Sequence, residues 1–435
     1  MVVAAFSDKS ESVLPARSSY RWTIVALLFA ATSINYIDRQ VLGILAPTLQ
    51  RELHWTETDY GAIISWFSLA YGVGLLLVGR AIDRVGVRRG FAYSIVVWSA
   101  AAMAHALART AGGFSIARAL LGLGESGNFP GSVKAVAEWF PKRERAFAIG
   151  IFNAGSNVGA VVAPLLVPWI ALTWGWQEAF IVTGALGIVW LFFWLLIYRE
   201  PARHPRVSAA ELEYIRSDQD EQPGTVRWAA LLGHRQTWAF IAGKAMTDPV
   251  WLFYLFWLPK FLDAEWGVKL TGLAAPLVAI YLLADVGSVG GGWLSSRLIA
   301  RGRTVNRSRK TAMLIAALLV VPTIFAPHTS SMWVAVGLVS LAAAAHQAWS
   351  ANLFTSVSDM FPRQAVATVM GIGGFAGAMA GMLFQRTTGY ILDASRSNYT
   401  VIFIIAGTTY LLALLVFHLL APRMESAKVE VSETK

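Results

Sequence analysis

The chain of 435 residues contains no cysteine and few charged residues. Without cysteine, disulfide bonds and thiol chemistry are excluded. Charged residues make up 14% of the chain, whereas a typical soluble domain has about 25%. Hydrophobic residues make up 56%. The composition therefore indicates a membrane protein, with the lipid bilayer as its surroundings.

Enzyme motifs are also missing. The sequence has no zinc-ligand cluster, no phosphate-binding loop of the G-x-x-x-x-G-K-[ST] type and no G-x-S-x-G turn for a nucleophilic serine. We therefore expect no enzyme, no metal site and no cofactor. The first twenty residues contain Asp8, Lys9, Glu11 and Pro15 instead of a basic start and a small-residue cleavage site. We expect the first helix to stay in the mature protein.

About twelve segments are long and apolar enough to cross a hydrocarbon core, which takes roughly 20 residues per helix. Backbone polar groups in lipid must be satisfied within the segment, so these spans are expected to be helices. The expected spans are 22-50, 58-80, 90-109, 112-139, 144-171, 177-198, 236-262, 270-296, 311-327, 331-360, 365-393 and 398-420.

The distribution of basic residues predicts the orientation. With the N-terminus inside, most of the 36 Lys and Arg residues fall in inner loops and tails. The outer loops hold only Arg51, Arg109, Lys269 and Arg396. We therefore predict that both termini are cytoplasmic. The formal net charge of +10 then suits an anionic inner leaflet and needs no nucleic-acid partner.

Residues 199-235 form the one long polar linker, and they separate two halves of six spans each, 1-198 and 236-435. The halves resemble each other, because Glu138-Trp-Phe-Pro-Lys142 aligns with Asp359-Met-Phe-Pro-Arg363. A chance likeness of apolar helices is the alternative, but it does not explain such polar and aromatic strings. A parallel repeat predicts a substrate site near the midplane, between two bundles that rock.

The loop after the second span carries a spaced set of glycine, acid and arginine residues, G-x-x-x-D-R-x-G-x-R-R. This set resembles the signature of major facilitator superfamily transporters, and the resemblance implies a cytoplasmic gate latch. We expect Asp83 to cap a neighbouring helix or to pair with Arg84 or Arg88. A solvated cluster of arginines is the alternative, but it does not explain Asp83. In the second half, Ser296 stands at the position that corresponds to the acid.

Several helix strings narrow the resemblance to one branch. They are NYIDR from Asn35, RALLGLGESGNFPG from Arg118, GIFNAGSNVGA from Gly150, DPVWLFYLFWLPKFL from Asp248 and HQAWSANLFTSVSDMFP from His346. These strings resemble the anion:cation symporter family, and most closely bacterial hexuronate transporters, which import glucuronate and galacturonate with protons. The fifth span lacks the G-x-x-x-G-P-x-x-G-G motif of drug antiporters, which makes export of hydrophobic drugs less favoured.

The first and fourth spans carry ionisable residues in their apolar interiors, where each must face a partner or a wet cavity. Asp38 and Arg39 are adjacent, so they are about 100° apart on a helix and need separate partners. Arg118 and Glu125 are seven positions apart and share a face, and Gly122 between them leaves room for the guanidinium to reach the carboxylate. We expect one cluster. A structural salt-bridge network is the alternative, although apolar residues are often as stabilising.

The cluster suggests a mechanism for transport. Arg39 presents a planar fork suited to a substrate carboxylate, while Asp38 or Glu125 takes up a proton and leaves the cluster positive enough to accept an anion. Asp38, Glu125 and Arg118 are the candidates for proton coupling, and the family resemblance implies the same roles. Sodium in place of protons stays open.

Neutral groups are expected to bind the sugar hydroxyls. Tyr36 shares a face with Arg39, and Tyr71 resembles a substrate-contacting tyrosine of the family; the alternative for both is an interfacial aromatic. Ser156 stands where galactonate-type relatives have glutamine, which favours a different or bulkier sugar acid. The full set of binding candidates is Arg39, Tyr36, Tyr71, Asn153, Ser156, Gln347, Trp349 and Asn352, with Trp349 expected to stack on a pyranose ring.

The second half offers fewer assignments. Asp248 and Pro249 could kink and gate the seventh span, but an ion pair of Asp248 with Lys244 one turn earlier is favoured over proton transport. His346 is either a pH-sensitive hydrogen bonder or, as we favour, a neutral histidine satisfied between helices. Asp285 lines the cavity or pairs with the seventh span. The gating candidates are Gly79, Asp83, Arg84, Gly86, Arg88, Asp248 and Pro249.

The sequence thus predicts an all-α membrane protein with twelve transmembrane helices in two pseudo-symmetric six-helix bundles, expected as a monomer in a bacterial inner membrane. The predicted function is proton-coupled import of a hexuronate by alternating access. The alternatives are symport of another sugar acid or organic anion, such as galactonate, glucarate or tartrate, and a membrane sensor that binds without transporting.

Overall fold

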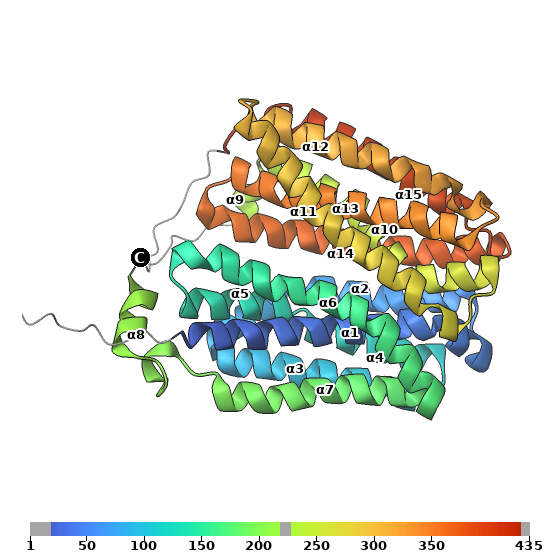
Figure 1. Ribbon diagram of the computed structural model, residues 1–435, viewed down its shortest axis with the longest axis horizontal. Coiled ribbons are helices and arrows are strands. Elements are labelled where there is room, and N and C mark those ends of the chain that lie inside the picture. The colour runs from blue at the N-terminus through green and yellow to red at the C-terminus, as the bar shows by residue number, and fades with distance from the viewer. Residues whose placement is uncertain (1–18, 218–227, 428–435) are drawn as a thin grey trace, which may run out of the picture.

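The computed structural model describes residues 19–217 and 228–427, and these residues form helices joined by short turns, without a strand among them (Figure 1). Of the first twenty residues, on which the expectation about the first helix rests, 1–18 lie outside the described residues. Residues 218–227 of the linker also lie outside them.

The first half contains α1 (Arg21–Leu53), α2 (Glu57–Val85), α3 (Val87–Ala104), α4 (Ala111–Glu125), α5 (Asn128–Trp139), α6 (Lys142–Trp174) and α7 (Trp176–Ile197). The second half contains α10 (Arg235–Trp266), α11 (Ala274–Ala300), α12 (Val305–Val320), α13 (Met332–Met360), α14 (Arg363–Ala394) and α15 (Thr400–Leu420). Shorter elements are η1 (His105–Leu107), η2 (Pro201–Arg203), α8 (Ala209–Arg216), α9 (Trp228–Leu232), η3 (Leu270–Gly272) and η4 (Val321–His328).

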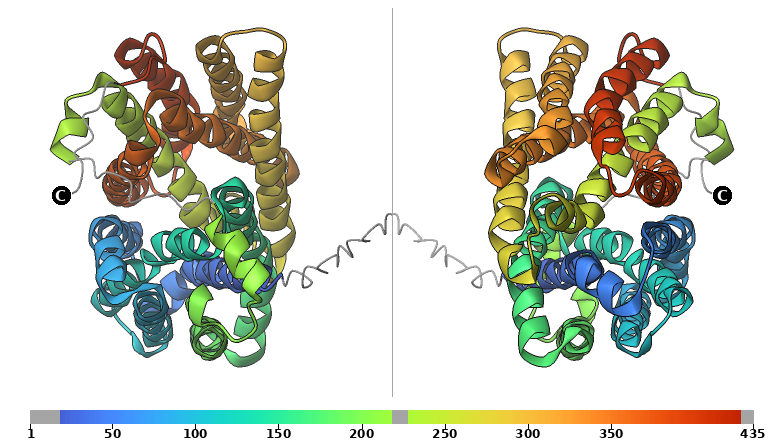
Figure 2. Two further views of the ribbon diagram at one scale, coloured as in Figure 1. Left: turned by 90° about the vertical axis from the view of Figure 1, so that its left-hand side faces the viewer. Right: turned by 90° about the vertical axis from the view of Figure 1, so that its right-hand side faces the viewer.

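The helices of each half pack mainly with one another, and Figure 2 shows the two groups end on. In the first half α1 packs on α6 and α7, and α2 packs on α4; in the second half α11 packs on α13, and α10 on α15. The halves meet where α2 lies against α14, α1 against α10 and α6 against α11. We keep 1-198, 199-235 and 236-435 as the proposed division of the chain.

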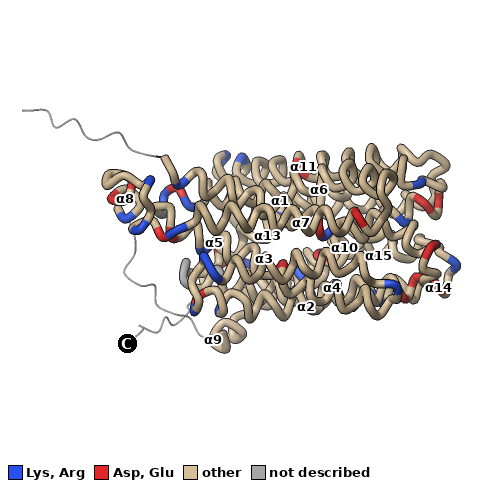
Figure 3. The backbone as a smooth tube through the Cα atoms, turned by 90° about the horizontal axis from the view of Figure 1, so that it is seen from below, with Lys and Arg blue, Asp and Glu red and all other residues tan. Residues whose placement is uncertain are grey.

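Nine helical segments of the described chain are long and apolar enough to cross a membrane. The three remaining expected spans are α1, the pair α4 and α5, and α10. Each of these three carries ionisable side chains in its interior, which lowers its apolar character, and α4 is also short. Figure 3 shows charged residues gathered at the two ends of the molecule, with few in the middle. The spans that look least like membrane helices therefore hold the central charges.

The fourth span is not the continuous helix expected over 112-139, because it is interrupted between α4 and α5 at Ser126 and Gly127. The Gly127 N–H donates to the Gly124 carbonyl, a tighter turn than the α-helix. Both glycines lie close to α3. A Cβ at Gly124 would be 2.5 Å from the backbone nitrogen of Trp98, and a Cβ at Gly127 would be 2.1 Å from Ser94 Oγ. Close packing therefore accompanies the break that sequence periodicity did not predict.

The ninth span also differs from the expected helix over 311-327. It begins earlier, at Val305, and from Val321 it continues as the 3-10 helix η4. Pro322 lies at the start of η4 and Pro327 lies inside it. Proline has no N–H to donate and its ring clashes with the preceding turn, so an α-helix is disfavoured there.

Candidate functional site

An ion pair between α1 and α4 forms the centre of the candidate site. Arg39 Nε and Nη2 both donate to Glu125 Oε2, at 2.9 Å and 2.8 Å, and both side chains are buried. Arg39 Nη2 also lies 3.4 Å from Asn35 Oδ1, one turn earlier on α1. Glu125 is the last residue of α4, at the break before α5. The structure therefore brings the predicted arginine and glutamate together near the middle of the bundle.

Arg118 joins this centre through the backbone of α1. Its Nη2 donates to the Arg39 carbonyl at 3.0 Å, and its side chain is fully buried. The predicted contact of the Arg118 guanidinium with Glu125 is wrong, because Arg118 binds the Arg39 carbonyl and only Arg39 binds the Glu125 carboxylate, through Oε2. Gly122 has a different role from the one expected. A Cβ there would lie 2.5 Å from the Phe67 carbonyl, so this glycine lets α4 approach α2.

Asp38 points away from Arg39, as expected for adjacent positions on a helix. Its side chain is 2% exposed, and it makes no ion pair with any residue in the described ranges. Neither carboxylate oxygen of Asp38 receives a hydrogen bond from the described residues. Asp38 is thus a buried carboxyl without a basic partner in contact among the described residues.

Three aromatic rings surround the Arg39 guanidinium. Its central carbon lies 4.9 Å from the ring centres of Tyr36 and Tyr71 and 5.2 Å from that of Phe67. Phe67 and Tyr71 stack on each other on α2, with ring centres 5.7 Å apart. The structure therefore places both predicted tyrosines at the arginine. The sequence analysis missed Phe67, although its spacing of four from Tyr71 puts the two rings on one helix face.

The two candidates on α6 are less clearly connected to this centre. Ser156 is buried and its hydroxyl donates to the Asn153 carbonyl at 2.7 Å, whereas the Asn153 side chain is exposed. No contact links either side chain to Arg39 in the part of the chain that the structure describes. Their predicted role in sugar binding stays a prediction.

His346 in α13 contacts residues of two neighbouring helices, so the prediction that it is satisfied between helices is confirmed, while its neutral state stays a prediction. Its Nδ1 lies 2.5 Å from the Tyr410 hydroxyl of α15, and its ring stacks on Trp251 of α10 with centres 4.9 Å apart. The histidine thus ties three helices of the second half together.

The remaining candidates on α13 lie apart from the arginine. Trp349 is fully buried, and its ring packs edge-on against Tyr410, so stacking on a pyranose would need the ring to become accessible. Asn352 Nδ2 donates to the Gly291 carbonyl of α11 at 3.1 Å. Gln347 is half-buried. The structure does not bring these side chains into contact with the centre formed by α1 and α4.

On α10, the predicted ion pair of Lys244 with Asp248 is confirmed, with Nζ 2.7 Å from Oδ2. The helix continues through Pro249 to Trp266, so the proline does not end it. Asp285 in α11 is half-buried and makes no ion pair with any described residue, so the predicted pairing with the seventh span is not found and the predicted role in lining the cavity stays a prediction.

The predicted latch residues pair differently from the expectation. Asp83 Oδ1 binds Lys134 Nζ of α5 at 2.8 Å, and not Arg84 or Arg88. Arg88 Nη2 donates to the Leu195 carbonyl of α7 at 2.5 Å. The reason is packing: α5 and α7 flank this turn, and their groups lie closer than those of the same loop. All of these contacts lie within the first half of the chain.

The two latch glycines also differ. Gly86 has φ +83°, a conformation that favours glycine, and it links α2 to α3. At Gly79 the nearest atom to an added Cβ would be Pro130 Cβ at 3.8 Å, an ordinary contact. The structure thus explains Gly86 by its backbone and leaves the predicted gating role of Gly79 a prediction.

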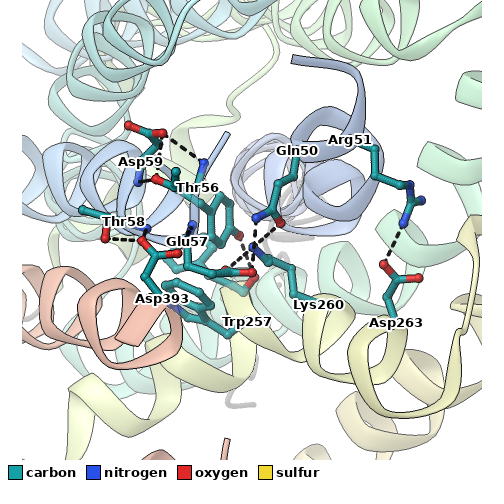
Figure 4. Close-up of polar contacts among 12 residues, drawn as sticks. Gln50, Arg51, Thr56, Glu57, Thr58, Asp59, Trp257, Lys260, Asp263 and Asp393 are labelled. Carbon is teal, nitrogen blue, oxygen red and sulfur yellow. Dashed lines mark hydrogen bonds and ion pairs between the residues drawn. The ribbon is translucent and has the colours of Figure 1, made fainter. Parts of the chain in front are cut away.

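A second polar region joins the two halves at the end where α1, α10 and α14 finish and α2 begins, which we call the distal end. Lys260 of α10 binds Glu57 of α2 and Gln50 of α1 (Figure 4). Lys260 and Glu57 are both buried. The sequence analysis did not single out Lys260 as a functional residue. An interior lysine was the signal that could have identified it.

Two further polar contacts close the distal end. Arg51 Nη1 lies 2.7 Å from Asp263 Oδ2, linking α1 to α10. Asp393, near the end of α14, accepts hydrogen bonds from the backbone N–H groups of Glu57 and Thr58 at 3.0 Å and 2.8 Å (Figure 4). Asp393 thus caps a helix of the opposite half.

Comparisons with known proteins agree with this architecture. A model of the Major Facilitator Superfamily matches residues 28–385. The hexuronate transporter of Escherichia coli K12 is 34% identical over 380 residues, 86% of this chain and 88% of that protein. A probable galactarate/D-glucarate transporter of the same strain is 30% identical over 431 residues, 94% of this chain and 95% of that protein. A solved bacterial homologue of the human lysosomal transporter Spinster shares the fold, with a TM-score of 0.74 at 19% identity, covering 93% of this chain and 97% of that chain.

Proposed function

The chain belongs to the major facilitator superfamily, and on this basis we propose that it imports a hexuronate together with protons by alternating access. It is a multi-pass inner-membrane transporter of the sugar-acid type and not an enzyme. The specific substrate, glucuronate or galacturonate, and the coupling to protons are our proposals.

The observation that carries the proposal is the buried cluster of α1 and α4. Arg39 has a carboxylate partner in Glu125, and Asp38 has no basic partner in contact among the described residues. Burial makes the ionised form of Asp38 costly, so this side chain is suited to gaining and losing a proton. Protonation of Asp38 or Glu125 leaves the cluster with an excess positive charge, and Arg39 can then bind a carboxylate with its planar fork.

The rings around Arg39 support recognition of a sugar acid. Tyr36, Tyr71 and Phe67 cover the guanidinium, and the two tyrosines bring hydroxyl groups that can bind sugar hydroxyls. An arginine enclosed by aromatic rings is partly dehydrated, which strengthens its interaction with a carboxylate. This arrangement favours a small anion with several hydroxyl groups.

We propose that both termini are cytoplasmic and that the distal end faces the outside. The Lys260 and Asp393 contacts then close the outer side of the central site. Alternating access requires these contacts between the halves to break when the site opens outward. The charge cluster lies within the first half and can persist through that change.

A second candidate is symport of a different sugar acid. The similarity to a probable galactarate/D-glucarate transporter, at 30% identity over nearly the whole chain, favours it. A non-transporting sensor of the same fold is a further alternative, but an arginine site paired with a titratable acid has no evident use in a protein that only binds.

Counterflow in proteoliposomes tests the proposal. Vesicles loaded with unlabelled glucuronate and diluted into labelled glucuronate are expected to accumulate the label transiently. Failure to exchange glucuronate and galacturonate would overturn the hexuronate assignment, and binding without exchange would identify a sensor.

Coupling is tested separately. An imposed inward proton gradient is expected to drive uptake at fixed sodium, and a proton ionophore is expected to abolish it. Uptake that follows the sodium gradient and ignores the ionophore would contradict proton coupling.

A further inference from the structure

The ion pair of Lys244 and Asp248 on α10 is not used by the function proposed above. Lys244 Nζ is 2.7 Å from Asp248 Oδ2, and the two side chains are 10% and 23% exposed. The ammonium group also lies 4.5 Å from the centre of the Phe354 ring. Lys244 is therefore already compensated by a carboxylate and an aromatic face, and it offers little positive charge to a ligand.

The position of the Asp248 carboxylate is fixed by α14. A Cβ at Gly377 would lie 2.3 Å from Asp248 Oδ2, so the acid rests directly on this glycine. On its other side it is held by Lys244. The carboxylate is therefore confined between two helices of the second half.

Asp248 lies across from the arginine site. A Cβ at Gly72, the residue after Tyr71, would lie 2.9 Å from Ala378 Cβ, and Ala378 follows the Gly377 on which Asp248 rests. Tyr36 lies near the middle of α1, and Asp248 lies near the middle of α10, and these helices pack on each other. A negative charge of the second half thus faces the site at which the first half presents its arginine.

We propose that Asp248 selects for sugar acids with one carboxylate and against those with two. The inference rests on the proposed function, in which Arg39 holds one carboxylate and the sugar extends toward the facing half. A second carboxylate there approaches the Asp248 end of the pair, and Lys244 cannot compensate it because its ammonium group is already bound by Asp248 and covered by the Phe354 ring. A hydroxyl group in the same place donates a hydrogen bond to Asp248. The pair therefore accepts the uncharged end of a hexuronate and rejects the charged end of a glucarate.

Asp248→Asn tests the proposal. The change removes the negative charge and frees Lys244, so glucarate transport is expected to rise at least tenfold relative to glucuronate transport. The measurement is counterflow of labelled glucuronate and labelled glucarate in proteoliposomes, with the ratio of the two initial rates compared between wild-type and variant protein. An unchanged ratio in a folded Asp248→Asn protein overturns the inference.

Two companion variants make the result specific. In Asp248→Asn with Lys244→Gln the gain for glucarate is expected to disappear, because the freed lysine is its source; a gain that persists contradicts the mechanism. Glu265→Gln removes an exposed acid near the end of the same helix, outside the proposed site, and is expected to leave the ratio within twofold. An equal shift in that control would mean that only the total charge matters, and would overturn the assignment to Asp248.

A single lysine variant keeps the inference testable if Asp248→Asn does not fold. Lys244→Gln leaves Asp248 uncompensated and is expected to lower glucarate rates more than glucuronate rates, the opposite shift. An unchanged ratio contradicts the proposal. Failure of the wild-type protein to exchange either compound is a different result, since it rejects the proposed function itself.

Discussion

The charged groups at the centre pair within one bundle, whereas those at the distal end pair between the two. Arg39 and Glu125 both belong to the first half, as does Arg118. Lys260 and Asp393 of the second half instead bind α1 and α2 of the first. Contacts inside a bundle survive a rocking motion, but contacts between bundles have to break.

The difference separates two tasks of a transporter. Under the proposed function, the central cluster binds an anion and a proton in either state, because its members move together. The distal contacts would then determine how often the site opens on that side, because each conformation gains or loses them. Variants of the centre should therefore change the chemistry, and variants of the distal end should change the populations of the two states.

Arg39→Ala is expected to have the largest effect. It removes the fork that binds the carboxylate and leaves Glu125 buried without its partner, so substrate affinity should fall more than a hundredfold. Affinity is measured by titration of purified protein with glucuronate. Arg39→Lys is the matched control for charge, and it should recover only part of the affinity, because an ammonium group lacks the planar fork. Unchanged affinity in Arg39→Ala would contradict the proposed site.

Asp38→Asn should abolish uptake driven by a pH gradient while counterflow continues. An amide cannot carry the proton, yet it keeps the size of this buried side chain. Uptake with and without an imposed pH gradient, together with counterflow, separates the two effects in vesicles. A wild-type accumulation ratio in this variant would show that Asp38 is not the coupling group.

Lys260→Met should have a moderate effect on conformation. It removes the contacts of α10 with Glu57 and Gln50, so the open distal state should become several-fold more populated. Because the chain has no cysteine, a single Ala46→Cys provides a clean label. Ala46 is buried one turn after Gly43, where a Cβ would lie 3.2 Å from the Leu255 carbonyl of α10. Faster labelling by a membrane-impermeant maleimide is expected, and equal rates would contradict a closing role for Lys260.

Asp83→Asn should have the smallest effect. Its ion pair with Lys134 lies within one bundle and is largely exposed, so its loss should lower the free energy of unfolding by no more than about 1 kcal/mol. The measurement is chemical denaturation in detergent. The same variant is the control for Lys260→Met, since labelling at Ala46→Cys should not change. A marked change in labelling would return Asp83 to the role of a gate between the bundles.

The helices and the central residues could be predicted from the sequence because the signals are local. Long apolar runs identify membrane spans, and the 100° turn per residue predicts separate partners for Asp38 and Arg39. The i to i+4 spacing likewise predicted the pair of Lys244 with Asp248, which the structure contains. Each of these inferences needs only one helix.

Partners on different helices could not be predicted in the same way. Arg118 of α4 reaches the Arg39 carbonyl of α1, and periodicity within one helix does not measure the distance between two helices. The contact of Lys260 with Glu57 joins residues from opposite halves of the chain, so it depends on how the bundles meet. Such contacts follow from tertiary packing, and only a three-dimensional structure reveals them.

The start of α2 has two sources of hydrogen-bond acceptors. Thr56 Oγ1 accepts from the Asp59 N–H at 3.0 Å within the same helix, while the Glu57 and Thr58 N–H groups depend on Asp393 of the other half. When the halves separate, Thr56 Oγ1 remains as an acceptor, whereas the N–H groups of Glu57 and Thr58 lose Asp393 and become exposed to water. Hydrogen exchange at Glu57 and Thr58, set against that at Asp59, therefore makes this helix terminus a built-in reporter of opening that needs no added probe.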